Sequence, residues 1–167
     1  GLTFESVLRR ILRHDPDVIM VGEIRDKETA ELAVRSALTG HLILSTLHTN
    51  DSVSAVTRLR NLGVAPYLIA GTLKVSIAQR LVRKICKECE GKGCELCSNT
   101  GYFGRTAVSE LFMTDSAVEE MIEKELSEGE IRRYLTRKGS GSLMYDAALK
   151  VKEGITTKDE VIREGLL

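Results

Sequence analysis

The stretch "DPDVIMVGEIRD", residues 15–26, places an apolar run directly before an acidic residue. Pro16 ends any helix that comes before it, because the residue preceding a proline avoids the helical region. Val18 to Val21 is apolar without alternation, which is typical of a strand covered on both faces in a parallel sheet. Glu23 follows this predicted strand, at a position where a carboxylate can handle a metal ion or a water.

Helical patterns surround this strand. The apolar spacing from Phe4 to Leu12 predicts a helix with Thr3 as its N-cap. Asp26 is suited to cap a helix over "KETAELAVRSALT", with Gly40 as its C′ residue. The run "HLILSTLH", residues 41–48, predicts a second buried strand.

Two more helices are expected before the first cysteine. Asn50 or Asp51 caps the first, which Gly63 ends. Pro66 suits the first turn of the second, which we expect to run to about Gln79. The alternation of helix and strand over residues 1–83 predicts an α/β layer with a parallel sheet. Two strands cannot complete such a sheet, so this region is interpreted as the back half of an α/β domain.

Residues 105–167 have a different pattern. "RTAVSELF" predicts a short strand, and helices are expected near Asp115 and at two capping boxes. The boxes pair Ser127 with Glu130 and Thr157 with Glu160. We therefore expect a small, mostly helical C-terminal subdomain, with residues 84–104 as a separate element between the two parts.

That middle element holds all four cysteines of the chain, in the pattern C-x2-C-x4-C-x2-C. Each C-x2-C pair can direct two thiolates at one point, so Cys86, Cys89, Cys94 and Cys97 predict a tetrahedral site in which all four positions are filled. Soft thiolates favour structural zinc. An iron–sulfur cluster and four unrelated buried thiols are the alternatives.

Composition excludes several classes of protein. The formal net charge is zero, which argues against nonspecific nucleic-acid binding. No apolar run has the length of a membrane span, and the first ten residues lack the hydrophobic region of a signal peptide. The sequence is therefore interpreted as that of a cytoplasmic protein without a direct membrane span.

Polar residues follow both predicted strands. Ligands of open α/β sheets bind beyond the carboxyl ends of the strands. Glu23 and Arg25 follow the first strand, and Thr46 and His48 lie at the end of the second. Together they form a candidate site for phosphate and Mg²⁺, which takes oxygen ligands and keeps several waters. The alternative is a surface ion pair between Glu23 and Arg25 beside a hydrogen-bonded core histidine.

Several motifs resemble those of the secretion traffic ATPases, the hexameric motors of type II secretion and type IV pilus assembly. They are the stretch from "LRRILRHDPDVIMVGEIRD" through "STLHTNDSVSAVTRL", then "AQRLVRKIC", "GYFGR" and "KVKEGITTKDEV". The resemblance covers nearly the whole chain. It implies the C-terminal part of a RecA-like P-loop ATPase domain.

The resemblance also implies roles for individual residues. Glu23 corresponds to the Walker B glutamate and His48 to the His-box residue, with Thr46 beside it. In the full-length protein, the family implies ATP and Mg²⁺ as ligands, a homo-hexamer, and partner proteins of a secretion or pilus platform at the inner membrane. The chain would then act on the cytoplasmic side, peripheral to that membrane.

Other family features are missing. The G-x-x-x-x-G-K-[ST] loop does not occur, since the only Gly-Lys pair is Gly91-Lys92 inside the cysteine cluster. The acidic box expected between that loop and Glu23 is missing too. We therefore expect a C-terminal fragment that cannot hydrolyse ATP alone.

The cysteine region agrees with the family only in part. Assembly ATPases carry a tetracysteine zinc site here, but their two cysteine pairs usually flank a long insertion, and here four residues separate them. Arg80 in "AQRL" and Arg105 in "GYFGR" could face nucleotide or a neighbouring subunit, or form ordinary surface ion pairs. The alternative function for the chain is a zinc-binding structural or interaction module without nucleotide chemistry.

Overall fold

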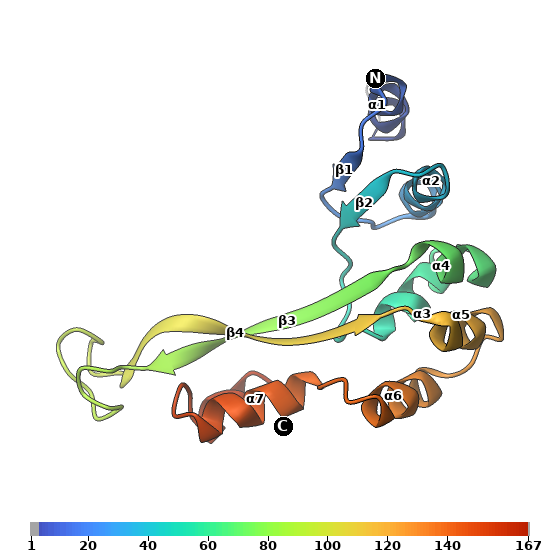
Figure 1. The fold of residues 1–167 in the computed structure, drawn as a ribbon. Coiled ribbons are helices and arrows are strands. Elements are labelled where there is room, and N and C mark those ends of the chain that lie inside the picture. The colour runs from blue at the N-terminus through green and yellow to red at the C-terminus, as the bar shows by residue number, and fades with distance from the viewer. Residues whose placement is uncertain (1–3, 167) are drawn as a thin grey trace. The chain divides into compact units, whose positions relative to one another are not determined.

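The computed structural model describes residues 4–166 and divides into two compact units, each described here by itself (Figure 1). Unit 1 comprises residues 1–76 and 113–134, and unit 2 comprises residues 77–112 and 135–167. The expected N-cap Thr3 lies outside the described residues. Within residues 4–166, no helix has both the length and the apolar character that a bilayer crossing requires.

Two parallel strands form the sheet of unit 1. β1 (Val18–Val21) pairs with β2 (Leu42–Ser45), and Val21 lies opposite Ser45. The helix α1 (Phe4–Ile11), with the 3-10 turn η1 (Leu12–His14), precedes β1, and α2 (Lys27–Leu38) connects the strands. Both predicted strands and their parallel pairing are confirmed, although β2 is shorter than the expected stretch.

Burial of β1 differs from the prediction. Ile19 and Val21 are buried, but Val18 and Met20 on the other face are 52% and 80% exposed. The expected burial of both faces is therefore wrong for the described part of the chain. The buried residues of α2 include Ala30, and α2 packs against β2. The sequence therefore has the apolar content of a two-sided strand, but only one side is covered.

The ends of α2 agree with the sequence. Asp26 accepts a hydrogen bond from the Thr29 amide at 2.8 Å, and Gly40 follows the helix with a φ of +100°. Asp51 binds the Ser54 amide at 2.9 Å at the start of α3 (Ser54–Asn61). Gly63 ends this helix with a φ of +88°. The predicted boundaries of α2 and the end of α3 are confirmed, whereas the N-cap of α3 is Val53 rather than Asn50 or Asp51, although Asp51 accepts a hydrogen bond from the first helical residue.

The helix that begins at Pro66 is shorter than predicted. α4 (Pro66–Thr72) ends well before Gln79, because the chain enters the strand β3 (Val75–Ile85). In β3 the residues alternate between exposed and covered positions over most of its length. Pairing with β4 (Tyr102–Met113) therefore overrides the helical pattern expected for this stretch.

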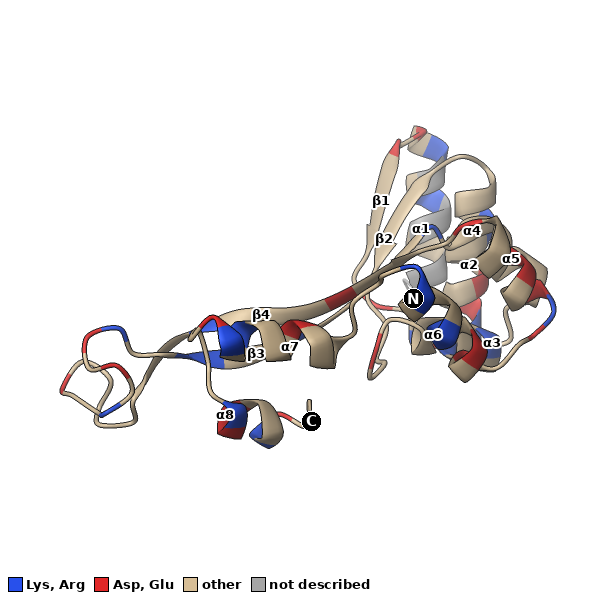
Figure 2. Cartoon of the chain, turned by 60° about the horizontal axis from the view of Figure 1, so that its bottom comes forward, with Lys and Arg blue, Asp and Glu red and all other residues tan. Residues whose placement is uncertain are grey.

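Four more helices follow β4. They are α5 (Ser116–Glu123), α6 (Glu128–Arg137), α7 (Leu143–Lys152) and α8 (Lys158–Arg163). α5 and most of α6 belong to unit 1, where α5 packs on α4, whereas α7 and α8 belong to unit 2. The helices are thus present, but they are not grouped as one helical subdomain. Figure 2 shows acidic and basic residues interspersed along α6 and α8.

The core of unit 2 lies between the β3–β4 ribbon and the two last helices. Val82 and Val108 are fully buried and pack with apolar residues of α7, α8 and the residues after α8; the other members are Leu143, Ala147, Val161 and Leu166. Ile85 donates a backbone hydrogen bond to Ile155, which links the end of β3 to the turn between α7 and α8. The four cysteine residues lie at the tip of this ribbon, in the loop between β3 and β4 (Figure 1).

Candidate functional site

The ends of β1 and β2 are held together by hydrogen bonds. The Ile24 amide donates to the Thr46 carbonyl at 3.0 Å, and the Thr46 hydroxyl donates to the Gly22 carbonyl at 2.7 Å. These bonds continue the pairing of the strands beyond their last residues. They bring the segment that contains Glu23 beside the segment that contains His48.

Glu23 and His48 contact each other directly. His48 Nε2 lies 3.1 Å from Glu23 Oε2. The expected proximity of the two side chains at one edge of the sheet is therefore confirmed. In the described chain Glu23 is 34% exposed and His48 is 75% exposed, so both can be reached from solvent.

Glu23 also pairs with Arg25. Arg25 Nε lies 2.6 Å from Glu23 Oε2, the same oxygen that His48 contacts. The hydrogen bond from Arg25 lowers the pKa of Glu23, His48 lowers it further, and partial burial opposes both effects. Glu23 is therefore ionised at neutral pH, and an ionised carboxylate oxygen is the type of ligand that Mg²⁺ takes. The ion pair of the alternative interpretation is therefore present, but its core histidine is wrong, because the His48 side chain is exposed.

The four cysteines form a cluster with the spacing of a tetrahedral metal site. Their sulfur atoms all lie within 4.8 Å of one another. Three of the separations are 3.9 Å (Cys86 to Cys94), 3.8 Å (Cys89 to Cys97) and 3.7 Å (Cys94 to Cys97). Thiolates bound to zinc at 2.3 Å in a tetrahedron stand about 3.8 Å apart. These three separations match that value, so the donor set and its spacing fit zinc.

Backbone groups support the sulfur atoms. The Gly93 amide donates to Cys89 Sγ and the Cys94 amide donates to Cys97 Sγ, each at 3.2 Å. Gly93 has a φ of +95°, which few other residues adopt. At Gly101 a Cβ atom would collide with the carbonyl oxygen of Gly91. The turns of this element therefore need glycine where the sequence has it.

The thiols differ in their acidity. Burial would raise the pKa of Cys97, but hydrogen bonds from the Cys94 and Gly101 amides, with neighbouring thiols, lower it to about 6. The pKa of Cys94 is raised to about 11: an amide hydrogen bond lowers it, but burial and the thiols of Cys89, Cys97 and Cys86 raise it. Cys97 is thus more acidic than Cys94, and a bound cation would favour the thiolate form of both.

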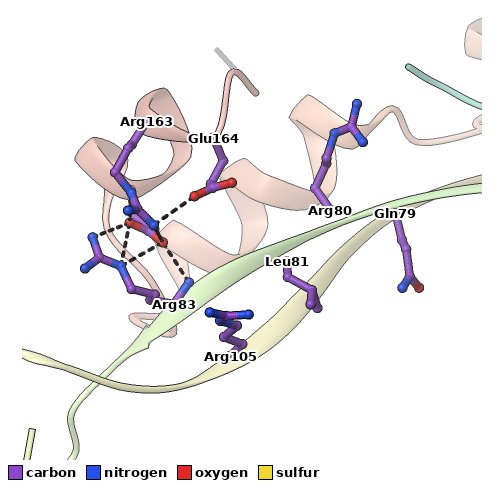
Figure 3. Close-up of a pocket in the computed structure, with 8 residues that line it drawn as sticks. Gln79, Arg80, Leu81, Arg83, Arg105, Arg163 and Glu164 are labelled. Carbon is purple, nitrogen blue, oxygen red and sulfur yellow. Dashed lines mark hydrogen bonds and ion pairs between the residues drawn. The ribbon is translucent and has the colours of Figure 1, made fainter. Parts of the chain in front are cut away.

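A second cluster of charges lies in unit 2. Glu160 is fully buried and accepts hydrogen bonds from the Arg83 amide and from the guanidinium groups of Arg83 and Arg163, at 2.7 to 3.0 Å (Figure 3). Sequence reasoning placed Glu160 in a capping box with Thr157. Only half of that box forms: the Glu160 amide donates to Thr157 Oγ1 at 3.1 Å. The Glu160 carboxylate binds arginine because two guanidinium groups supply stronger, charge-assisted hydrogen bonds.

Arg80 and Arg105 line a pocket of about 560 Å³ beside this ion pair, together with Arg83 and Arg163 (Figure 3). Both lie in unit 2, whereas Glu23 and His48 lie in unit 1. Arg83 also stacks over Tyr102, with its guanidinium carbon 4.2 Å from the ring centroid. The alternation of β3 and the i,i+3 spacing of Glu160 and Arg163 were the sequence signals that could have indicated this cluster.

Comparison with known proteins places this geometry in a family. The family model for type II/IV secretion system proteins matches residues 1–163. The chain belongs to this family of secretion proteins. The secretion-family chain is 45% identical over 170 residues to the type II secretion system protein HxcR of Pseudomonas aeruginosa. It is 43% identical to the type II secretion system ATPase E of Vibrio cholerae and to the type IV pilus assembly ATPase PilB of Thermus thermophilus.

Each of these alignments covers 97% of the secretion-family chain but only 36%, 37% and 21% of the respective relatives. The chain thus spans about a third or less of their length. Solved structures agree with the fold. The pilus retraction motor PilT with bound ADP superposes with a TM-score of 0.78 at 28% identity, covering 97% of this chain and 43% of that one. The ATPase DotB of Legionella pneumophila gives a TM-score of 0.73 at 29% identity, covering 98% and 42%.

Proposed function

We propose that the chain is part of a hexameric ATPase motor that couples ATP hydrolysis to type II protein secretion or type IV pilus assembly. The observation that carries this proposal is the contact between Glu23 and His48 at the carboxyl ends of two parallel strands. Relatives named as secretion and pilus ATPases support it. The motor would work on the cytoplasmic side of the inner membrane, against platform proteins of the secretion or pilus system.

In this proposal each residue of the site has a distinct role. Glu23 holds Mg²⁺ or orients one of its waters, because its carboxylate is ionised and within reach of solvent. His48 contacts the γ-phosphate of ATP from the neighbouring strand end, and Thr46 keeps the two strand ends together through Gly22. Mg²⁺ supplies positive charge to the phosphate oxygens when it is bound. The phosphate-binding loop and the acidic box would come from another part of the full-length protein, so residues 1–167 alone would not hydrolyse ATP.

The cysteine cluster has a structural part in the same proposal. Cys86, Cys89, Cys94 and Cys97 hold one zinc ion with no open position, and the ion stabilises the tip of the β3–β4 ribbon. Residues 1–83, 84–104 and 105–167 then correspond to the ATPase part, the zinc element and the C-terminal part that the sequence predicts. The other candidate function is a zinc module without nucleotide chemistry. The spacing of the four sulfur atoms supports a zinc site in both candidate functions, so it does not distinguish between them.

The test separates these two functions in the full-length protein. Glu23→Gln keeps the shape of the side chain and removes its charge, so ATP should still bind while hydrolysis is lost. The control is Glu31→Gln, because Glu31 lies on α2 and pairs with Lys27 at 3.7 Å without contacting the site. Normal turnover in Glu23→Gln, measured as phosphate release, contradicts the role of Glu23, whereas a wild-type full-length protein that releases no phosphate from ATP contradicts the motor proposal and leaves the zinc module.

A further inference from the structure

The segment that carries His48 has no regular secondary structure between β2 and α3. At its first end, Thr46 is bound to Gly22 and Ile24 through the hydrogen bonds described above. His48 itself is largely exposed and contacts Glu23 through one ring nitrogen. The position of an exposed side chain on an irregular segment depends on how firmly the two ends of that segment are held.

The second end is held at Asp51. Asp51 Oδ1 accepts hydrogen bonds from the Ser54 amide and hydroxyl, each at 2.9 Å, and lies 2.5 Å from Arg132 Nη2. Burial would raise the pKa of Asp51, but Arg132 and Ser54 lower it, so the carboxylate stays ionised. Ser52 follows directly and is buried, and its carbonyl accepts a hydrogen bond from the Ser76 hydroxyl at 2.8 Å. Asp51 is therefore the point at which the irregular segment becomes fixed.

Arg132 comes from α6, far along the sequence from His48. α6 is itself firmly placed: Ile131 is buried, and the capping box of Ser127 and Glu130 is complete, with the Ser127 amide 2.9 Å from Glu130 Oε2. Glu128, one turn before Arg132, contacts the Ser54 hydroxyl at 3.1 Å. Arg132 is half-buried, so it presents its charge to Asp51 from a helix with a fixed position.

We propose that Arg132 is a positioning residue for His48: by holding Asp51, it fixes the segment of residues 46–51 so that His48 stays beside Glu23. The consequence for hydrolysis rests on the proposed function, whereas the consequence for the segment rests on the geometry alone. Displacing a catalytic group by about 1 Å can reduce a rate by up to 100-fold. An ion pair on a distant helix can thus act on a nucleotide site that it does not touch.

The first experiment is hydrogen exchange of the full-length protein without nucleotide. In Arg132→Gln, amides of residues 47–51 should exchange about fivefold faster, the upper range for a partly exposed ion pair. Arg132→Lys keeps the charge and should restore at least half of the protection. The matched control is Arg133→Gln, because Arg133 is the next residue of the same helix and is exposed. Unchanged exchange in residues 47–51 overturns the proposal.

A second variant tests the same contact from its other partner, so that a general destabilisation of α6 cannot explain the result. Asp51→Asn keeps an oxygen for the Ser54 amide, removes the charge that binds Arg132, and leaves the sequence of α6 intact. If the two residues act as one contact, the double variant should exchange no faster at residues 47–51 than the single variants do. Additive effects of the two substitutions mean that they act separately, which overturns the proposal.

The second readout is turnover. Arg132→Gln should lower kcat about tenfold and leave the KM for ATP within about threefold, because positioning affects the reaction more than binding. Faster exchange with normal kcat shows that the segment is held by Arg132 without consequence for hydrolysis, which overturns the positioning role. A failure of the proposed function is recognised differently: the wild-type full-length protein then releases no phosphate from ATP, whereas the exchange of residues 47–51 still responds to Arg132→Gln.

Discussion

Replacing Glu160 with glutamine should lower the free energy of unfolding by about 3 kcal/mol at pH 7. Two arginines and one backbone amide surround this fully buried carboxylate, and their hydrogen bonds outweigh the cost of burial and lower its pKa from 4.5 to about 2. At about 1.4 kcal/mol per pKa unit, this difference corresponds to about 3 kcal/mol. Breaking a buried ion pair costs about 3–5 kcal/mol. The lower value applies because Arg83 and Arg163 are 34% and 54% exposed and can be hydrated once released.

The same contribution predicts a specific dependence on pH. Because the pKa is lowered in the folded state, the stabilisation is complete above about pH 5. It is lost as the pH falls from 4.5 towards 2, and less than half of it remains at pH 3. The difference in stability between the wild type and Glu160→Gln should therefore shrink by about half between pH 7 and pH 3.

Urea denaturation of the full-length protein, followed through a probe in residues 135–167, measures this difference at both pH values. Glu164→Gln is the matched control: Glu164 also pairs with Arg163, at 2.8 Å, but on the surface, so its removal should cost less than about 1 kcal/mol. A difference below about 1 kcal/mol for Glu160→Gln at pH 7, or one that is the same at pH 3, would refute the reasoning.

Two other substitutions test the ribbon tip. Cys94→Ser should remove one ligand of the proposed zinc site. Elemental analysis of protein purified without chelator should therefore give about one zinc per chain for the wild type and clearly less for the variant. Iron in the wild type, or a folded protein without metal, contradicts the zinc assignment. Gly101→Ala should lower the free energy of unfolding by about 2 kcal/mol or more, because the φ of +75° disfavours alanine and the new Cβ atom would collide with Gly91. Thermal unfolding is measured with zinc bound, and a midpoint equal to that of the wild type contradicts this reasoning.

The parts of the fold that follow local rules could be predicted from the sequence. Asp26 and Gly40 delimit α2 because a cap and a positive φ are properties of the residues themselves. The parallel pairing of β1 and β2 follows from the helix between them. The end of α4 could not be predicted in this way, since residues after Thr72 pair with β4, a strand that begins at Tyr102.

The candidate site shows the same division. The proximity of Glu23 and His48 follows from the edge that two parallel strands share, so the sequence predicts it once the strands are recognised. The contact of Asp51 with Arg132 joins residues that are 81 positions apart, and no local pattern indicates it. The spacing around Glu160 predicts a capping box, and Arg83 becomes a candidate partner only once residues 75–85 are recognised as a strand.

The position of the cysteine pairs at the tip of the ribbon makes this part of the chain tolerant of changes in length. Glu90 and Lys92 lie between the two pairs and are exposed, and the amide-to-sulfur hydrogen bonds run from Gly93 to Cys89 and from Cys94 to Cys97. Residues added there would lengthen a closed loop, and doubling a loop costs only about 0.6 kcal/mol. A few residues added beside Lys92 should therefore leave β3, β4 and the four cysteines in place.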